Sequence, residues 1–331
     1  MNTTKKRIGW ADICKGLLIT LLIFSHLFWV SKSKYGIQNQ VIDSVGIICS
    51  IWNCFFMSCF IMVSGMFSNF NKPAKAFIIG NFKALIVPAW VSMVLFNLPH
   101  ITNLDYISFF NRAFLYGGGK WFLTALFLSK ILLYICVKGE IKKWIVLAIL
   151  LFISFLGKLL DDLDAFPNYW YHRNFMNFAF FLGIGYYFKD FIQKNVVGIV
   201  SALAFTITIV ILFAMRISVP NVVSIFNESF AQHPLTLWLS IMGSITCIHL
   251  CKLIKNNVIL EFLGKNSLIV YIYHMYFLSY CISALCPSLY NGTLVNSLVI
   301  VFMVITSTLV ICSGIATVME MKLFRWMKGV F

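Results

Sequence analysis

The amino-acid sequence predicts an all-α protein, a polytopic transmembrane helical bundle of about ten spans. Hydrophobic residues make up 60% of the 331 residues and charged residues only 11%, which is too apolar for a water-exposed surface around one core. Apolar runs long enough to cross a hydrocarbon layer of ~30 Å recur along the whole chain. Such runs must be helical, because lipid offers the backbone no other hydrogen-bond partner.

Ten runs fit this pattern, and the loops between them are too short for a soluble domain, so we expect one integral membrane domain over residues 1–331. The fifth run ends on Lys158, and this lysine either extends to the membrane interface or packs inside the bundle. The runs cover residues 13–30, 44–67, 77–97, 121–137, 143–158, 174–188, 195–215, 235–251, 266–286 and 293–318.

The formal net charge of +15 indicates topology rather than a nucleic-acid partner. An even number of spans puts both termini on one side, where 16 of the 26 Lys and Arg residues fall, against seven on the other side. The positive-inside rule then places both termini in the cytoplasm. The basic residues 5–7 precede an apolar run as in a signal peptide, but no small-residue cleavage site follows, so we expect the first span to be retained.

Cysteine and histidine spacing gives no indication of a metal site. Most of the ten cysteines fall inside predicted spans without a CxxC pair, so they are expected to pack as small apolar side chains. The histidines lack HExxH or similar spacing, and we predict no metal. The Gly117–Gly119 run lacks the spacing of a phosphate-binding loop, and no GxSxG nucleophile motif occurs.

The first span, "DICKGLLITLLIFSH" over residues 12–26, contains two ionisable residues in an apolar run. Eleven residues at 100° each return to within about 20°, so Lys15 and His26 share one helix face, ~16 Å apart along the axis. A neutral imidazole can take a proton from an alcohol, and a lysine can bind phosphate. The pair suits a donor with a phosphorylated cytoplasmic head and a long arm, such as a coenzyme A thioester; a hydrogen-bonded histidine and an interfacial lysine are the alternative.

Further polar residues lie in later spans. Ser267, Tyr271 and His274 form a stripe on one face of the ninth span, and His274 is a second candidate for proton handling or substrate orientation. A stripe that only joins helices is equally consistent with this spacing. Other residues expected to line a donor site are Lys83, before Pro88 of the third span, together with Ser64, Trp121, Asn266 and Ser267.

Two loops on the non-cytoplasmic side, residues 98–120 and 158–173, mix aromatic, acidic and amide side chains. Aromatic faces stack on sugars while Asp and Asn accept or donate hydrogen bonds to hydroxyls, so these loops could bind a carbohydrate. An aromatic belt at the membrane interface explains the same composition.

Five motifs together resemble the membrane-bound acyltransferase-3 family, in particular its sugar O-acetyltransferase branch, which includes fucose 4-O-acetylase-like proteins. The similarity spans about residues 8–317. The motifs are Lys-x10-His in the first span, "FMSCFIMVSGMF" in the second, "KALIVP" in the third, "KWFLTALF" in the fourth and "LGKNSLIVYIYH" in the ninth.

The resemblance implies that an acetyl or other acyl group passes from cytoplasmic acyl-CoA, a co-substrate rather than a bound cofactor, to a carbohydrate hydroxyl. His26 corresponds to the catalytic histidine of the family, and Lys15 and Lys83 correspond to its basic donor-binding positions. We therefore expect a bacterial plasma-membrane O-acetyltransferase acting on a cell-surface polysaccharide, such as lipopolysaccharide or capsule, or on its lipid-linked precursor.

Two other classes fit parts of the sequence. A secondary transporter or flippase for a glycolipid could relay protons through His26 and His274, but the predicted spans contain almost no carboxylates. A non-catalytic membrane scaffold could assemble with other polysaccharide-assembly proteins. Within the enzyme hypothesis, direct attack by the acceptor is favoured over an acetyl-histidine intermediate.

Overall fold

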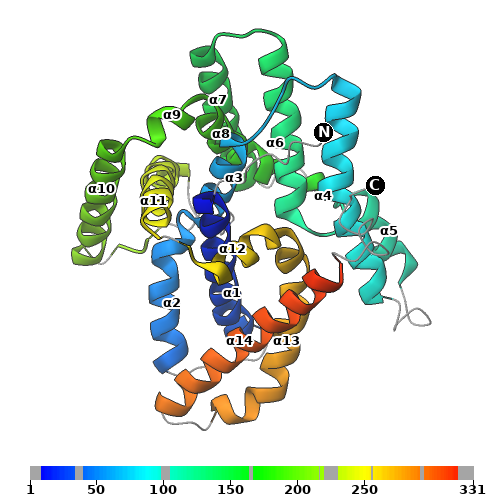
Figure 1. Cartoon of the computed structure of the whole chain (residues 1–331), viewed down its shortest axis with the longest axis vertical. Coiled ribbons are helices and arrows are strands. Elements are labelled where there is room, and N and C mark those ends of the chain that lie inside the picture. The colour runs from blue at the N-terminus through cyan, green and yellow to red at the C-terminus, as the bar shows by residue number, and fades with distance from the viewer. Residues whose placement is uncertain are drawn as a thin grey trace. The chain divides into compact units, whose positions relative to one another are not determined.

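The computed structural model describes residues 9–33, 40–97, 105–163, 167–215, 217–219, 230–254, 256–290 and 294–319. Within these ranges the chain is helical and contains no strand, which confirms the predicted fold class (Figure 1). The helices are α1 (Gly9–Ser33), α2 (Gln40–Asn53), α3 (Phe56–Met66), α4 (Ala74–Asn97), α5 (Tyr106–Phe114), α6 (Trp121–Lys138), α7 (Lys143–Asp162), α8 (His172–Tyr187), α9 (Lys189–Ile192), α10 (Asn195–Ala214), α11 (His233–Leu253), α12 (Val258–Lys265), α13 (Ser267–Tyr290) and α14 (Leu294–Val318).

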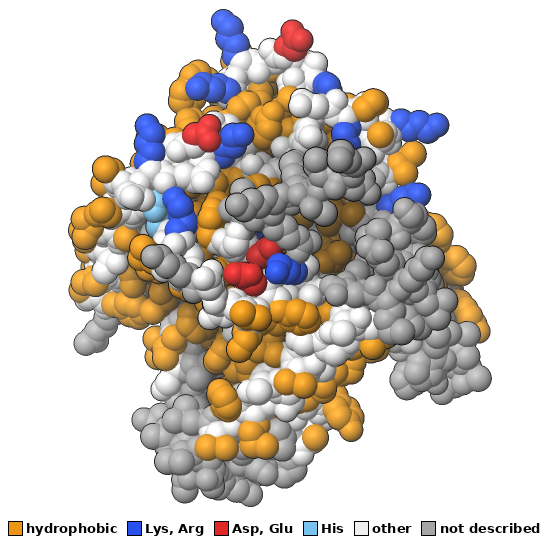
Figure 2. Space-filling model, viewed as in Figure 1, with side chains coloured by type: hydrophobic (Ala, Val, Ile, Leu, Met, Phe, Trp, Pro, Cys, Tyr) orange, Lys and Arg blue, Asp and Glu red, His pale blue; other side chains and the backbone are white. Residues whose placement is uncertain are grey.

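Nine helices in the described part of the chain are long and apolar enough to cross a membrane. Hydrophobic side chains are exposed over much of the face shown in Figure 2. Large hydrophobic residues that are exposed on the nine helices include Phe152, Ile199 and Phe302. A surface of this kind is stable only in an apolar solvent. The protein is therefore a multi-pass integral membrane protein.

The predicted spans match the helices closely, with one difference. The sixth expected run, residues 174–188, forms α8, which has 16 residues and is too short to be counted among the nine spans. The fifth run forms the 20-residue α7, and Lys158 packs inside the bundle with only 1% of its surface exposed. Of the two positions predicted for this lysine, the buried one is correct.

The described residues form two compact units, each built from separate stretches of sequence. Unit 1 comprises residues 1–60, 193–219 and 239–316, and therefore contains α1, α2, α10 and α12 to α14. Unit 2 comprises residues 61–192, 220–238 and 317–331, and contains α4 to α9. Helices α3 and α11 each contribute to both units, and the last two residues of α14 belong to unit 2.

In unit 1, the short helix α12 lies directly against the first half of α1 (Figure 1). Two glycines allow this contact: a side chain at Gly16 would collide with the carbonyl of Leu260, and one at Gly264 would collide with the carbonyl of Asp12. The Asn257 side chain caps the start of α12 by accepting a hydrogen bond from the Leu260 N–H, 2.9 Å away. Helix α13 also packs against α1 and brings His274 to it.

In unit 2, α8 packs between α6 and α7. Trp121 of α6 stacks on Phe178 of α8, and the Ser129 hydroxyl donates a hydrogen bond to the Phe175 carbonyl, 3.3 Å away. These contacts bury most of the inner face of α8.

Ion pairs join the end of α7 to the start of α8. Lys158 lies 2.7 Å from a carboxylate oxygen of Asp162 and 3.4 Å from Asp161, and Arg173 lies 3.1 Å from the other oxygen of Asp161. These acidic residues belong to the loop region 158–173 that was considered for sugar binding. Their carboxylates instead neutralise buried cations, which removes a costly unpaired charge from the bundle.

The loop region 98–120 contains α5, which exposes several large apolar side chains. Tyr106, Ile107 and Phe110 are all more than half exposed, and Asp105 caps the helix by accepting hydrogen bonds from two backbone N–H groups. An amphipathic helix of this kind suits the membrane interface, so α5 favours the aromatic-belt interpretation. Residues 98–104 and 164–166 lie outside the described residues.

Candidate active site

The two histidines singled out in the sequence form a pair in unit 1. His26 lies on α1 and His274 on α13, and the Nδ1 atom of His26 is 2.7 Å from the Nε2 atom of His274. Their rings are nearly parallel, 8° apart, with centroids separated by 4.9 Å. His274 is 1% exposed, whereas His26 is half-buried.

Backbone carbonyls determine which nitrogen of each neutral ring carries its proton. The Nδ1 atom of His274 lies 2.7 Å from the Tyr271 carbonyl and 3.1 Å from the Val270 carbonyl, and a carbonyl can only accept a hydrogen bond. Nδ1 of His274 therefore carries the proton, and its Nε2 accepts one from Nδ1 of His26. This places a lone pair on Nε2 of His26, the atom that can act as a base.

Lys15 lies half-buried on α1, eleven residues before His26 and on the same helix face. Helix α12 packs against α1 at the neighbouring Gly16. Asn266 is 4% exposed and ends α12, where its amide donates a hydrogen bond to the Phe262 carbonyl, while Ser267 begins α13. Unit 1 thus contains Lys15, His26, Asn266, Ser267 and His274.

The other three expected site residues belong to unit 2. Lys83 is half-buried on α4, Ser64 is half-buried on α3, and Trp121 begins α6. The contact described for Trp121 is stacking on Phe178.

A polar group next to His26 was not found from the sequence. The Trp52 indole N–H donates to the Ser25 hydroxyl at 2.8 Å, and this hydroxyl donates to the Asn53 side-chain oxygen at 2.6 Å. Trp52 and Asn53 end α2, and Ser25 directly precedes His26 on α1. The sequence did contain one indication of this polar group, because Trp52 and Asn53 are adjacent polar residues within an apolar run.

A second feature missed in the sequence is a pocket in unit 2. It has a volume of about 250 Å³ and contains Lys72, Asn81 and Lys130 among its lining residues. The Lys130 ammonium group donates a hydrogen bond to the Asn81 side-chain oxygen, 3.3 Å away, and the Tyr134 hydroxyl donates to the Lys72 carbonyl at 2.9 Å. Lys130 lies inside a predicted span, and an intramembrane lysine is usually functional.

These features define a class of protein: a multi-pass membrane protein with a hydrogen-bonded pair of imidazoles within its helices. Comparison with protein families then gives the particular family. Residues 8–317 match a family described as an acyltransferase domain, and the chain belongs to this acyltransferase-3 family. No curated protein and no solved structure matches the chain.

Family membership confirms the prediction of an acyltransferase and implies an acyl donor and an acceptor. The match covers nearly the whole chain, including every residue discussed above as a site candidate. The roles of these residues, the acetyl group and the carbohydrate acceptor remain predictions.

Proposed function

We propose that the protein is an O-acetyltransferase that moves an acetyl group from cytoplasmic acetyl-CoA to a carbohydrate hydroxyl. The acceptor is a cell-surface polysaccharide or its lipid-linked precursor, and the enzyme acts in a bacterial plasma membrane with both termini in the cytoplasm. The observation that carries the proposal is the His26–His274 pair, in a chain that belongs to an acyltransferase family.

In this mechanism, Nε2 of His26 takes the proton from the acceptor hydroxyl as its oxygen attacks the thioester carbonyl. The tetrahedral intermediate collapses with cleavage of the C–S bond, and the imidazolium returns the proton to the departing thiolate. The products are an O-acetyl ester and CoA with a free thiol. His26 leaves the cycle in its starting protonation state.

His274 acts on His26 rather than on the substrate. Its Nε2 accepts the Nδ1 proton of His26, which selects the tautomer with the basic atom at Nε2 and fixes the ring orientation. This is the role that a carboxylate plays beside many catalytic histidines. The sequence shows no acid near His26 in the first span, and the distant His274 fills this position.

Basic residues would bind the phosphates of the donor. In unit 2, the pocket with Lys72 and Lys130 lies at the lysine-rich end of this unit where α4 begins. The positive-inside rule assigns this lysine-rich end to the cytoplasm, where acyl-CoA is found. Lys15 of unit 1 and Lys83 of unit 2 each stay a separate candidate for the same role.

The test is a transfer assay with purified full-length protein, radiolabelled acetyl-CoA and a panel of bacterial envelope glycans and glycolipids. We expect an accepting glycan to raise the rate of thiol release by at least ~100-fold over the rate without acceptor, because general base catalysis needs a hydroxyl to deprotonate. The label should appear in the glycan as an ester that mild base removes.

Two results would refute this function. One is thiol release that is the same with and without every carbohydrate, because the donor would then be hydrolysed or would acylate another acceptor. The other is label in an amide that resists mild base. A panel of acyl-CoA chain lengths in the same assay identifies the preferred acyl group.

A further inference from the structure

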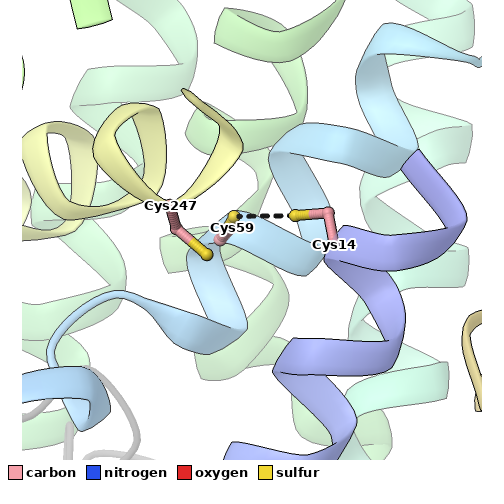
Figure 3. Close-up of side chains that lie close together, drawn as sticks. All are labelled: Cys14, Cys59 and Cys247. Carbon is pink, nitrogen blue, oxygen red and sulfur yellow. Dashed lines mark hydrogen bonds between the residues drawn. The ribbon is translucent and has the colours of Figure 1, made fainter. Parts of the chain in front are cut away.

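Three buried cysteine thiols meet in unit 1. Cys14 of α1, Cys59 of α3 and Cys247 of α11 point toward one another (Figure 3). Their sulfur atoms all lie within 4.8 Å of one another, and the Cys14 and Cys59 sulfurs are 4.0 Å apart. None of the three residues is more than 4% exposed.

The backbone around this thiol cluster is held in place by its own contacts. Helix α2 ends at Asn53 and α3 begins at Phe56, and the carbonyls at this break accept hydrogen bonds from α11. Ser240 donates to the Cys54 carbonyl at 2.6 Å, and Ser244 donates to the Phe55 carbonyl at 3.4 Å. These bonds hold Cys59 and Cys247 in a fixed relation before any ligand binds.

The spacing of the sulfurs matches metal coordination. With metal–sulfur bonds of about 2.3 Å, thiolates around one ion lie about 3.8 Å apart in tetrahedral geometry and about 4.0 Å apart in trigonal geometry. The Cys14–Cys59 separation of 4.0 Å already falls in this range. Cys251 follows Cys247 by one helical turn and is fully buried.

The ligand type restricts the ion. Thiolate sulfur ligands select soft or borderline d¹⁰ ions, which are zinc(II) and copper(I). Each coordinating thiol loses its proton to solvent on binding, and the cation offsets the charge of the thiolates in the low-dielectric interior. The alternative is a set of neutral thiols, in which the Cys59 S–H donates to the Ser244 carbonyl at 3.6 Å.

We propose that Cys14, Cys59 and Cys247 bind one zinc(II) or copper(I) ion, with Cys251 as a fourth ligand. The ion would fix the first half of α1 to α3 and α11. Its role is structural, and the proposal does not depend on the identity of the acyl acceptor.

The experiment measures metal content in full-length protein purified with an affinity tag free of His and Cys, from cells supplied with zinc or with copper. The reduced protein is then titrated with each ion and measured again by mass spectrometry. We expect about one ion per chain in the wild type and at least a tenfold lower content in C14S and C247S. The matched control is C312S, because Cys312 is also fully buried in unit 1 but lies outside the thiol cluster.

Thermal unfolding separates metal binding from a packing defect. Addition of the preferred ion should raise the melting temperature of metal-depleted wild type and of C312S, and should leave C247S unchanged. X-ray absorption should show three or four sulfur neighbours at about 2.3 Å. The proposal fails if metal-supplied wild type binds neither ion, or if C247S binds as much as C312S.

Discussion

The chemistry of single residues depends on one hydrogen-bonded chain in unit 1. It runs from the Tyr271 carbonyl through His274 to His26, and each link has a fixed direction because a carbonyl only accepts. A half-buried imidazole alone would exchange between two tautomers, and one of them would present the wrong nitrogen to the acceptor. In the proposed mechanism His274 is therefore a positioning residue, and its contribution can be separated from that of His26.

Replacement of His274 tests this separation. In H274L the ring of His26 loses its acceptor, so we expect kcat for acyl transfer to fall about 10- to 100-fold while KM for the donor changes little. In H274Q the side-chain oxygen can accept the same hydrogen bond, and activity should be partly restored. Steady-state kinetics on purified variants measure both values.

A double mutant completes this comparison. Because His274 acts through His26, adding H274L to H26A should cause no further loss of rate. Equal loss in H274L and H274Q, or a further loss in the double mutant, would show that His274 has a different role.

At the scale of helices, close contacts between short segments bring the site residues together. Helix α12 ends and α13 begins around Asn266, and close contacts at Gly16 and Gly264 pack α12 against α1. His274 of α13 then contacts His26 of α1. In unit 2, α4 and α6 pack together and form the pocket with Lys130. The lysine lies within a span that otherwise has little charge.

Replacement of Lys130 tests the pocket as a donor site. We expect K130Q to raise KM for acyl-CoA about tenfold with little change in kcat, because the lost contact would hold the phosphates in ground state and transition state alike. The matched control is K138Q, since Lys138 is an exposed lysine on the same helix. Adenosine 3′,5′-bisphosphate should inhibit K130Q less than wild type by the same factor. An unchanged KM would instead assign the pocket to another anion, such as a lipid headgroup.

At the scale of the whole molecule, the composition determines the fold class because lipid leaves only helices available to a chain this apolar. The predicted positions of the helices were accurate for the same reason. Helix α8 was the exception, because it packs against α6 and α7 and is too short to be counted as a span. His26 and His274 were each found as ionisable residues in apolar runs, but their pairing depends on tertiary contacts 248 positions apart. The thiol cluster and the pocket of Lys130 were not predicted for the same reason, because each is formed by residues far apart in the sequence.

The central claim is that His26 is the base that deprotonates the acceptor. The most direct measurement compares the acetyl-transfer rates of wild type, H26A and H172A, after membrane insertion has been verified for each protein. His172 is a suitable control because it begins α8 in unit 2, whereas the histidine pair belongs to unit 1. We predict that H26A loses at least ~100-fold in rate and H172A keeps the wild-type rate. An inserted H26A protein within a few-fold of the wild-type rate would contradict the account.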